Sequence, residues 1–185
     1  RGKVDILIIS NDRDLWQLAG NGNIIMVPGK KGEFEWLGEK EVDAKLGFEA
    51  DKIADYKGLR GDPSDNIPGV FGVGEVTATK LLQKYGSLEE IYRNIEKIEP
   101  ESLKKKLLES YEQALMSKRL AQIVLDVPFQ INLEECKYSD LNKIKVKETL
   151  EKYNFKSLIK RLGFSVDEKK KDKESEVSDK QLSLL

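Results

Sequence analysis

The apolar positions near the start of the chain predict a small β-sheet. Residues 4–9 (VDILII) are short, β-branched and almost continuously apolar, which is typical of a strand buried on both faces of a parallel sheet. Residues 24–27 predict a second strand. Residues 33–37 predict an edge strand or loop in which Trp36 packs into the core. The first sixty residues therefore favour an α/β arrangement.

After this region the apolar spacing changes from the period of a strand to that of a helix. Ala78, Leu81, Leu82 and Tyr85 recur at i, i+3, i+4 and i+7, which places them on one helix face before Gly86 as a C-cap. Further helices are expected at 15–18, at 39–46 ended by Gly47, at 52–59 ended by Arg60 and Gly61, at 87–94 with a Ser87–Glu90 capping box, as one or two long helices between 100 and 123, and at 146–153 and 155–162.

The pattern gives three regions: an α/β part at 1–60, a mainly α-helical part at 61–164, and a tail at 165–185. Residues 167–180 are Lys, Glu and Asp of mixed sign without apolar periodicity, as in a solvated linker. The chain starts at Arg1 without an initiator methionine and enters a strand almost at once, so we expect it to come from a longer protein.

The amino-acid composition argues against several kinds of functional site. The 32 Lys and Arg residues balance 33 Asp and Glu residues, so nucleic-acid binding would depend on local patches and metal ions. The absence of histidine excludes histidine acid–base catalysis and argues against a zinc site. Cys136 is the single cysteine, which excludes an internal disulfide and fits a reducing cytosol. No apolar run approaches the length of a membrane span, so we expect a soluble protein.

Three glycines stand directly before the helix that contains Ala78. Gly69, Gly72 and Gly74 permit positive φ and let another backbone come close, and the first N–H groups of a helix attract an anion. A phosphodiester is the anion that best suits such a backbone-lined site. The alternative is a tight turn between two helices in which the glycines only relieve strain.

Four aspartates are the candidates for chemistry. Asp12 and Asp14 follow the first strand, where open α/β sheets collect ligands, and Asp62 and Asp65 lie in a turn closed by Asn66. Carboxylates without His or Cys suit Mg²⁺ or Mn²⁺, and two such ions can hydrolyse a phosphodiester. This interpretation requires the two pairs to converge in space. The alternative for the first pair is that it only caps the following helix.

These stretches together resemble a known family. SNDRDLWQL and YKGLRGDPSDNIPGVFGVGEVTATKLLQKYGSLEEIY resemble the second half of the 5′-nuclease domain of bacterial DNA polymerase I, in the flap-endonuclease superfamily, and the likeness runs over residues 4–164. The resemblance implies a Rossmann-like core with the remnant of a parallel sheet. It also implies that Asp12, Asp14, Asp62 and Asp65 hold part of a two-metal cluster of Mg²⁺ or Mn²⁺.

The glycine hairpin matches that family's helix-three-turn-helix, a helix-hairpin-helix-like motif that grips duplex DNA. The resemblance places phosphate contacts at Gly72, Gly74, Thr77 and Lys80, and a K⁺ ion at the backbone carbonyls of Val70 and Val73. Val76 stands where these hairpins usually carry a lysine, so one phosphate contact is expected to be missing.

The implied function is metal-dependent 5′→3′ exonuclease and flap-endonuclease activity in replication and repair, in a monomer of the bacterial cytoplasm and nucleoid. The family's remaining acidic residues and its helical arch lie upstream of Arg1. The alternative is therefore a catalytically incomplete fragment that grips duplex phosphates without cutting.

The last five residues, 181–185 (QLSLL), are apolar again. From Gln181 they are similar to the peptide by which bacterial proteins dock on the sliding clamp, although Leu185 replaces the expected aromatic residue. The alternative is that they are the end of the linker or the start of a further domain.

Overall fold

The computed structural model describes residues 4–137 and 142–164, so the charged stretch and the clamp-like peptide of the sequence analysis lie outside the described residues. The chain divides into two compact units, Arg1–Val127 and Pro128–Leu185. The α/β part and the first helices after residue 60 thus share one unit. The proposed boundary at 60/61 stays a prediction.

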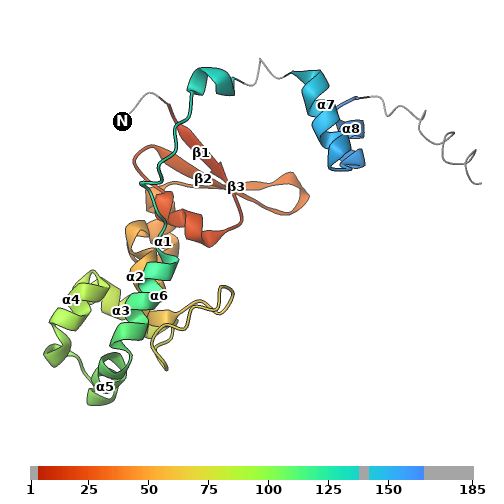
Figure 1. The fold of residues 1–185 in the computed structure, drawn as a ribbon. Helices are drawn as coiled ribbons and strands as arrows, with labels where there is room; N and C mark the ends of the chain where they lie inside the picture. The colour runs from red at the N-terminus through yellow and green to blue at the C-terminus, as the bar shows by residue number, and fades with distance from the viewer. Residues whose placement is uncertain (1–3, 138–141, 165–185) are drawn as a thin grey trace, which may run out of the picture. The chain divides into compact units, whose positions relative to one another are not determined.

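Three strands form a small sheet in the first unit (Figure 1). They are β1 (Ile6–Ile9), β2 (Asn23–Pro28) and β3 (Phe34–Leu37), in the order β1-β2-β3. β1 and β2 are parallel, whereas β3 runs antiparallel to β2. The α/β class and all three strands are confirmed, and the sheet is mixed: the short turn between β2 and β3 can only return the chain antiparallel.

One face of this sheet is covered. Ile25 and Leu37 point to it and are buried against Trp16, Val42 and Ile53. The covering elements are η1 (Arg13–Leu18), α1 (Glu39–Leu46), η3 (Ala50–Lys52) and the start of α2 (Ile53–Arg60). This packing fixes the segment that follows β1 against the segment that begins α2.

The opposite face is open and apolar. Leu7 pairs with Ile24, and Trp36 pairs with Met26, so these side chains share one face. Leu7, Ile24 and Trp36 are each at least 42% exposed. The expectations that residues 4–9 are buried on both faces and that Trp36 packs into the core are therefore wrong for the described chain. The reason is that β1 pairs only with β2 among the described residues, and the described elements that pack into the sheet's core lie against its other face.

The helices after the sheet pack around a second core. They are α2, α3 (Glu75–Tyr85), α4 (Leu88–Arg93), the 3₁₀ turn η4 (Ile95–Lys97), α5 (Glu101–Glu109) and α6 (Tyr111–Ala121). The core is formed by buried residues that include Leu59, Leu82, Ile91 and Leu107. α2 and α6 lie side by side (Figure 1), and a Cβ at Gly58 would come within 3.1 Å of the Ala114 carbonyl. Glycine at this position lets the two backbones approach.

The ends of these helices follow the local signals in the sequence. Gly47 adopts the left-handed conformation after α1, with φ of 77°. The Ser87 hydroxyl accepts a hydrogen bond from the Glu90 backbone N–H at 3.2 Å and caps α4. The apolar pattern after Pro100 forms two helices, α5 and α6, which are separated at Ser110.

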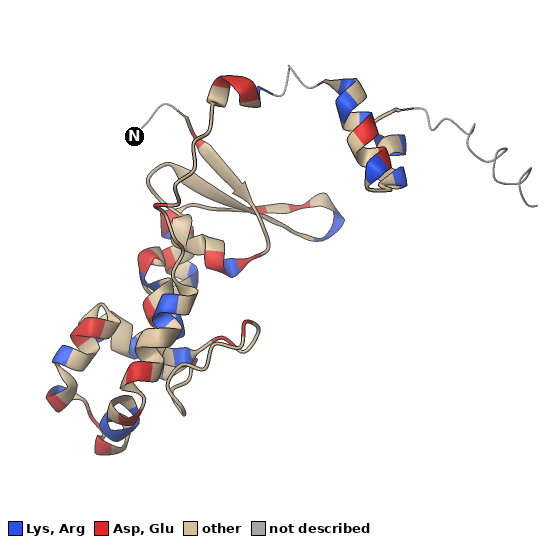
Figure 2. Cartoon of the chain, viewed as in Figure 1, with Lys and Arg blue, Asp and Glu red and all other residues tan. Residues whose placement is uncertain are grey.

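The second unit contains η5 (Leu133–Cys136), α7 (Lys143–Lys152) and α8 (Lys156–Arg161), close to the helices expected at 146–153 and 155–162. Acidic and basic residues are interspersed along the helices of both units (Figure 2), in line with a net charge of −1. Every described helix is too short or too polar to cross a lipid bilayer.

Candidate metal centre and glycine hairpin

Three of the four candidate aspartates converge. Asp14, Asp62 and Asp65 each present one carboxylate oxygen, and these oxygens all lie within 4.8 Å of one another. Asp14 comes from η1, beyond the carboxyl end of β1, and the other two come from the turn after α2. The convergence that the sequence analysis required is therefore present for these three residues. It arises because η1 and α2 pack together beneath the sheet.

The turn that carries two of these carboxylates is closed by its own hydrogen bonds. The Asp62 N–H donates to the Ile67 carbonyl and the Ile67 N–H donates to the Asp62 carbonyl, both at 2.8 Å. Asn66 adopts positive φ of 57°, which Asn tolerates better than most residues. The Asp62 Oδ1 atom accepts from the Ser64 N–H at 2.9 Å and from the Ser64 hydroxyl at 2.6 Å. These contacts leave Oδ2 of Asp62 directed at the cluster.

Asp12 is placed differently from the other three. Its Oδ1 atom accepts the Asp14 N–H at 2.9 Å, so the side chain is the N-cap of η1. It is exposed, and it is not among the three aspartates that converge. Of the two interpretations left open for the first pair, capping describes Asp12, whereas Asp14 joins the cluster. The metal role of Asp12 stays a prediction.

A lysine that the sequence analysis did not single out lies at the centre of the cluster. The Lys57 ammonium forms an ion pair with Asp14, lies 2.6 Å from Oδ2 of Asp62 and lies 3.6 Å from Oδ2 of Asp65. The signal was present in the sequence, because Lys57 falls at i+4 from Ile53 and i+3 from Ala54, on the buried face of α2. A charged residue on an apolar helix face needs a partner.

Charge in the cluster is mutually stabilised. Burial alone raises the pKa of the Asp62 carboxyl, but hydrogen bonds from Lys57 and Ser64 outweigh burial and lower that pKa to about 2. Burial also lowers the pKa of the Lys57 ammonium, and hydrogen bonds to Asp14 and Asp62 more than offset it, so this pKa lies above its ordinary value. At neutral pH Asp62 is therefore a carboxylate beside the Lys57 ammonium.

The donor set fits a hard divalent cation. Three carboxylates supply only oxygen ligands, which Mg²⁺ and Mn²⁺ prefer, and no His or Cys contributes. The carboxylates are partly accessible, with side-chain exposures of 24% for Asp14, 16% for Asp62 and 52% for Asp65. The cluster is thus a possible acidic metal-binding group that solvent ions can reach.

The glycine hairpin follows the acidic turn directly and is anchored from inside. The Val70 N–H donates to the Leu59 carbonyl at 2.7 Å, and the side chains of Val70 and Val73 are buried. A Cβ on Gly69, which has φ of +62°, would lie 2.2 Å from the Gly61 nitrogen. Residue 69 must therefore be glycine, and its contact with Gly61 ties the hairpin to the start of the acidic turn.

Helix α6 holds the same glycine on its other side. The Gly69 N–H donates to the hydroxyl of buried Ser117 at 3.0 Å, and the Gln113 side-chain amide donates to the Gly69 carbonyl at 2.5 Å. Both polar groups of the Gly69 backbone therefore have side-chain partners. Neither partner carries a local signal in the sequence, because the contact joins segments far apart in the chain.

The outer surface of the hairpin is exposed backbone at the N-terminus of α3. Gly74 is the N-cap, and a Cβ there would meet no atom within 4 Å. Lys80 is exposed and Thr77 is half-buried, while Val76 presents an apolar side chain that is 66% exposed. The Lys106 ammonium lies 3.5 Å from the Gly72 carbonyl, which adds a cation that the sequence analysis had not identified.

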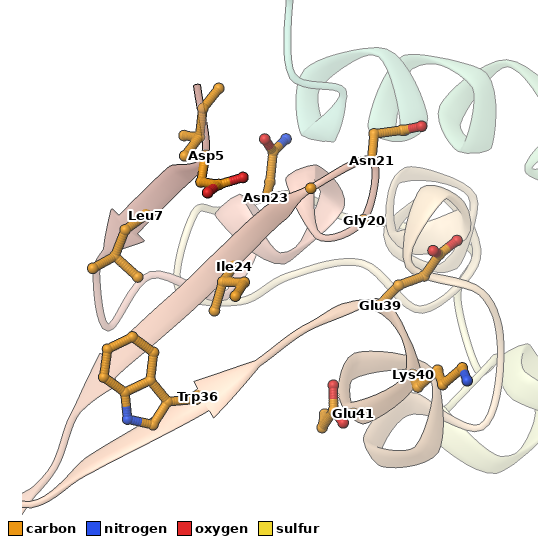
Figure 3. A pocket seen from close by; sticks show the side chains of 12 residues that line it. Asp5, Leu7, Gly20, Asn21, Asn23, Ile24, Trp36, Glu39, Lys40 and Glu41 are labelled. Atoms are coloured by element: carbon orange, nitrogen blue, oxygen red, sulfur yellow. The ribbon is translucent and has the colours of Figure 1, made fainter. Parts of the chain in front are cut away.

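A separate hollow of about 690 Å³ lies over the open face of the sheet. Figure 3 shows Leu7, Ile24 and Trp36 projecting from the three strands, with Glu39 and Lys40 at the start of α1 forming another wall. None of the three cluster aspartates lines it. The hollow is therefore distinct from the acidic centre.

Comparisons with known proteins identify the relatives of this chain. The sequence model described as "5'-3' exonuclease, C-terminal SAM fold" matches residues 48–144. DNA polymerase I of Caldicellulosiruptor bescii is 44% identical over 167 residues, which are 88% of this chain and 19% of that protein. DNA polymerase I of Bacillus subtilis is 38% identical over 174 residues, 93% of this chain and 20% of that protein. The chain thus spans about a fifth of the length of these curated relatives.

Solved structures show the same fold at low sequence identity. A structure of T5 5'-exonuclease with divalent metal ions (zinc) bound superposes with a TM-score of 0.53 and 19% identity, covering 63% of this chain and 43% of that chain. T5 flap endonuclease in a pseudo-enzyme-product complex with DNA and metal ions also gives a TM-score of 0.53, at 18% identity and the same coverage.

Proposed function

The chain belongs to the 5′-3′ exonuclease family, and we propose that it is part of a divalent-metal-dependent 5′→3′ exonuclease and flap endonuclease of a bacterial DNA polymerase I. Its substrate would be duplex DNA with a 5′ end or a 5′ flap, met during replication and repair. The observation that carries this proposal is the convergence of Asp14 with Asp62 and Asp65 from two remote segments.

Asp14, Asp62 and Asp65 would hold the divalent cation, Mg²⁺ or Mn²⁺, and Asp12 would add a further ligand. A bound cation supplies a more acidic water and stabilises negative charge on a phosphodiester. The complete site would hold two ions with the help of further acidic residues of the nuclease domain. Ser64 fixes the Asp62 carboxylate through two hydrogen bonds, which orients Oδ2 without help from a ligand.

The hairpin would position the DNA. Backbone N–H groups at the start of α3 favour an anion, and Gly72, Gly74, Thr77 and Lys80 would contact phosphates. The open space around Gly74 supports this role, because a phosphate can approach the backbone there. K⁺ at the carbonyls of Val70 and Val73 would add positive charge. Exposed Val76 would contribute no charged contact.

The test is cleavage of a 5′-flap oligonucleotide by a DNA polymerase I that contains this chain. Asp62→Asn is expected to reduce Mg²⁺-dependent cleavage by about 100-fold or more, because it removes a carboxylate ligand, while duplex binding in EDTA is kept. Asp51→Asn is the matched control, since Asp51 is an exposed carboxylate that forms an ion pair with neighbouring Lys52. Cleavage by the Asp62→Asn protein at the unaltered rate would refute the proposal.

A second candidate function is duplex binding without cleavage by this chain alone. The position of the Lys57 ammonium among the three carboxylates that converge in the described part of the chain favours it, because their negative charge is then already partly compensated. Salt-dependent duplex binding in EDTA that is lost in Gly74→Val would support this function. Robust flap cleavage by the 185-residue chain would exclude it.

The remaining expectations follow from this proposal. We expect a monomer that works at the bacterial nucleoid and docks on the sliding clamp through residues 181–185. Clamp affinity that is unchanged after removal of these five residues would contradict the docking.

A further inference from the structure

Lys57 occupies the point on which three carboxylates converge. Its ammonium pairs with Asp14, hydrogen-bonds Asp62 at 2.6 Å and lies 3.6 Å from Asp65. The same three aspartates each offer one carboxylate oxygen to a possible cation site, and those oxygens lie within 4.8 Å of one another. The ammonium therefore contacts the three carboxylates that a metal bound by these residues would use.

Both carboxylate oxygens of Asp62 already accept hydrogen bonds, which affects how a cation could bind. Its Oδ1 atom already accepts two hydrogen bonds from Ser64, and its Oδ2 atom accepts the one from Lys57. A cation that binds Oδ2 would compete with the ammonium, because two positive charges this close repel each other and both are attracted to the same carboxylate.

Lys57 is held in this position by the fold. It extends from α2, its side chain is only 11% exposed, and its helix neighbours Ile53, Ala54 and Leu59 are buried. A surface lysine would lose conformational entropy to form such contacts and gain little. The packing of α2 instead positions the ammonium of Lys57 in the cluster.

Resting on the proposed function, we propose that Lys57 is a built-in counter-ion that keeps the acidic cluster together in the metal-free protein, and that a divalent cation binds by displacing its ammonium. The apparent affinity for the cation is then the intrinsic affinity multiplied by the small fraction of molecules in which the ammonium has left. Lys57 therefore sets the cation concentration at which the site fills.

Lys118 provides a natural comparison. It also comes from a packed helix and pairs with two carboxylates, Asp55 at 2.6 Å and Glu89 at 2.8 Å. The three converging acidic residues found in the described chain do not include this pair. Removal of Lys118 should thus disturb packing without affecting a cation site.

The experiment is a calorimetric titration of the 185-residue chain with Mn²⁺. Lys57→Met is expected to bind Mn²⁺ about tenfold or more tightly than the unaltered chain, because the competitor is gone. Lys118→Met controls for the loss of a half-buried ion pair. Arg60→Met controls for the loss of a nearby charge, since Arg60 lies three residues along the same helix and is exposed. Both controls should keep the affinity within about twofold.

Thermal unfolding gives a second measurement that does not depend on activity. In EDTA, Lys57→Met is expected to melt at a lower temperature than the unaltered chain. Saturating Mn²⁺ should raise the melting temperature of Lys57→Met by more than it raises that of the unaltered chain. If the methionine variant does not fold in EDTA, Lys57→Gln replaces it in both measurements, because glutamine keeps a hydrogen-bond donor without the charge.

The outcomes separate this inference from the proposed function. Mn²⁺ binding that needs Asp62 but is unchanged by Lys57→Met would overturn the inference and leave the metal site standing. Tighter binding in Lys118→Met than in Lys57→Met would also overturn it. Absence of Mn²⁺ binding in every variant would overturn the metal site and the inference with it.

Discussion

The glycine hairpin and the acidic cluster are neighbours in the chain, yet they are held in different ways. The hairpin is fixed by backbone contacts, with Gly69 pressed against Gly61 and bonded to Ser117 on α6. In the cluster, the negative charge of carboxylates from two segments is compensated by one side chain, that of Lys57. The proposed DNA-contacting surface is therefore part of the folded framework, whereas the proposed metal site responds to the cations available.

The difference has a physical origin. Packed backbone leaves almost no alternative conformation, so the hairpin keeps its shape whether or not a ligand is bound. Clustered carboxylates repel one another and are stable only while a cation lies between them. A protein built in this way would hold DNA in a fixed position while its chemistry depends on the ion.

The strongest test of the rigid region is Gly69→Ala. The added Cβ would lie 2.2 Å from the Gly61 nitrogen at φ of +62°, and the other nearest atoms are also backbone, the Arg60 carbonyl carbon and the Gly61 Cα. We expect a loss of about 3 kcal/mol or more in the free energy of unfolding, measured by urea denaturation. A loss below about 1 kcal/mol would show that the hairpin is less tightly fixed than the contacts indicate.

A smaller effect is expected for Ser117→Ala. The buried Gly69 N–H would lose its hydroxyl acceptor, which costs about 1–3 kcal/mol when no water replaces it. Ser102→Ala is the control, because Ser102 is exposed on α5 and should change stability by less than about 0.5 kcal/mol. Equal urea midpoints for the two variants would contradict the anchoring role of α6.

The acidic cluster should reveal itself in the dependence of stability on pH. The pKa of Asp62 falls to about 2 in the folded protein from 3.8, so its contribution is complete above pH 4 and is lost as the pH falls towards 2. Urea midpoints at pH 5 and pH 2.5 should therefore differ more for the unaltered chain than for Asp62→Asn. The same difference in both proteins would show that the carboxylate is not stabilised by Lys57 and Ser64.

The smallest effect on stability is expected for Gly74→Ala. The new methyl group would meet no atom within 4 Å and φ is −92°, so the unfolding free energy should change by less than about 1 kcal/mol. Duplex binding in EDTA should weaken nonetheless, because the methyl group stands where a phosphate would approach. A large loss of stability would place Gly74 with Gly69 in the rigid framework.

Local signals made much of the fold predictable. The strands β2 and β3, the helices α1 to α4 and the glycine ends of α1 and α3 follow from apolar periodicity and capping residues within a few positions of one another. The turn with Asp62 and Asp65 and the hairpin before α3 could also be predicted, because their residue types are local signals of a turn. The hydrogen bonds within the turn, and the bond from the Val73 N–H to the Val70 carbonyl within the hairpin, join residues that are close in sequence.

The helices and strands, the acidic turn and the glycines of the hairpin could be predicted from neighbouring residues alone. The packing of remote segments was needed to show that Asp14 joins Asp62 and Asp65 while Asp12 caps a helix, that Lys57 lies among the three carboxylates, and that Trp36 lies on an open face. These outcomes depend on which remote segments pack together, and local periodicity does not indicate which distant residues a side chain contacts in the folded protein.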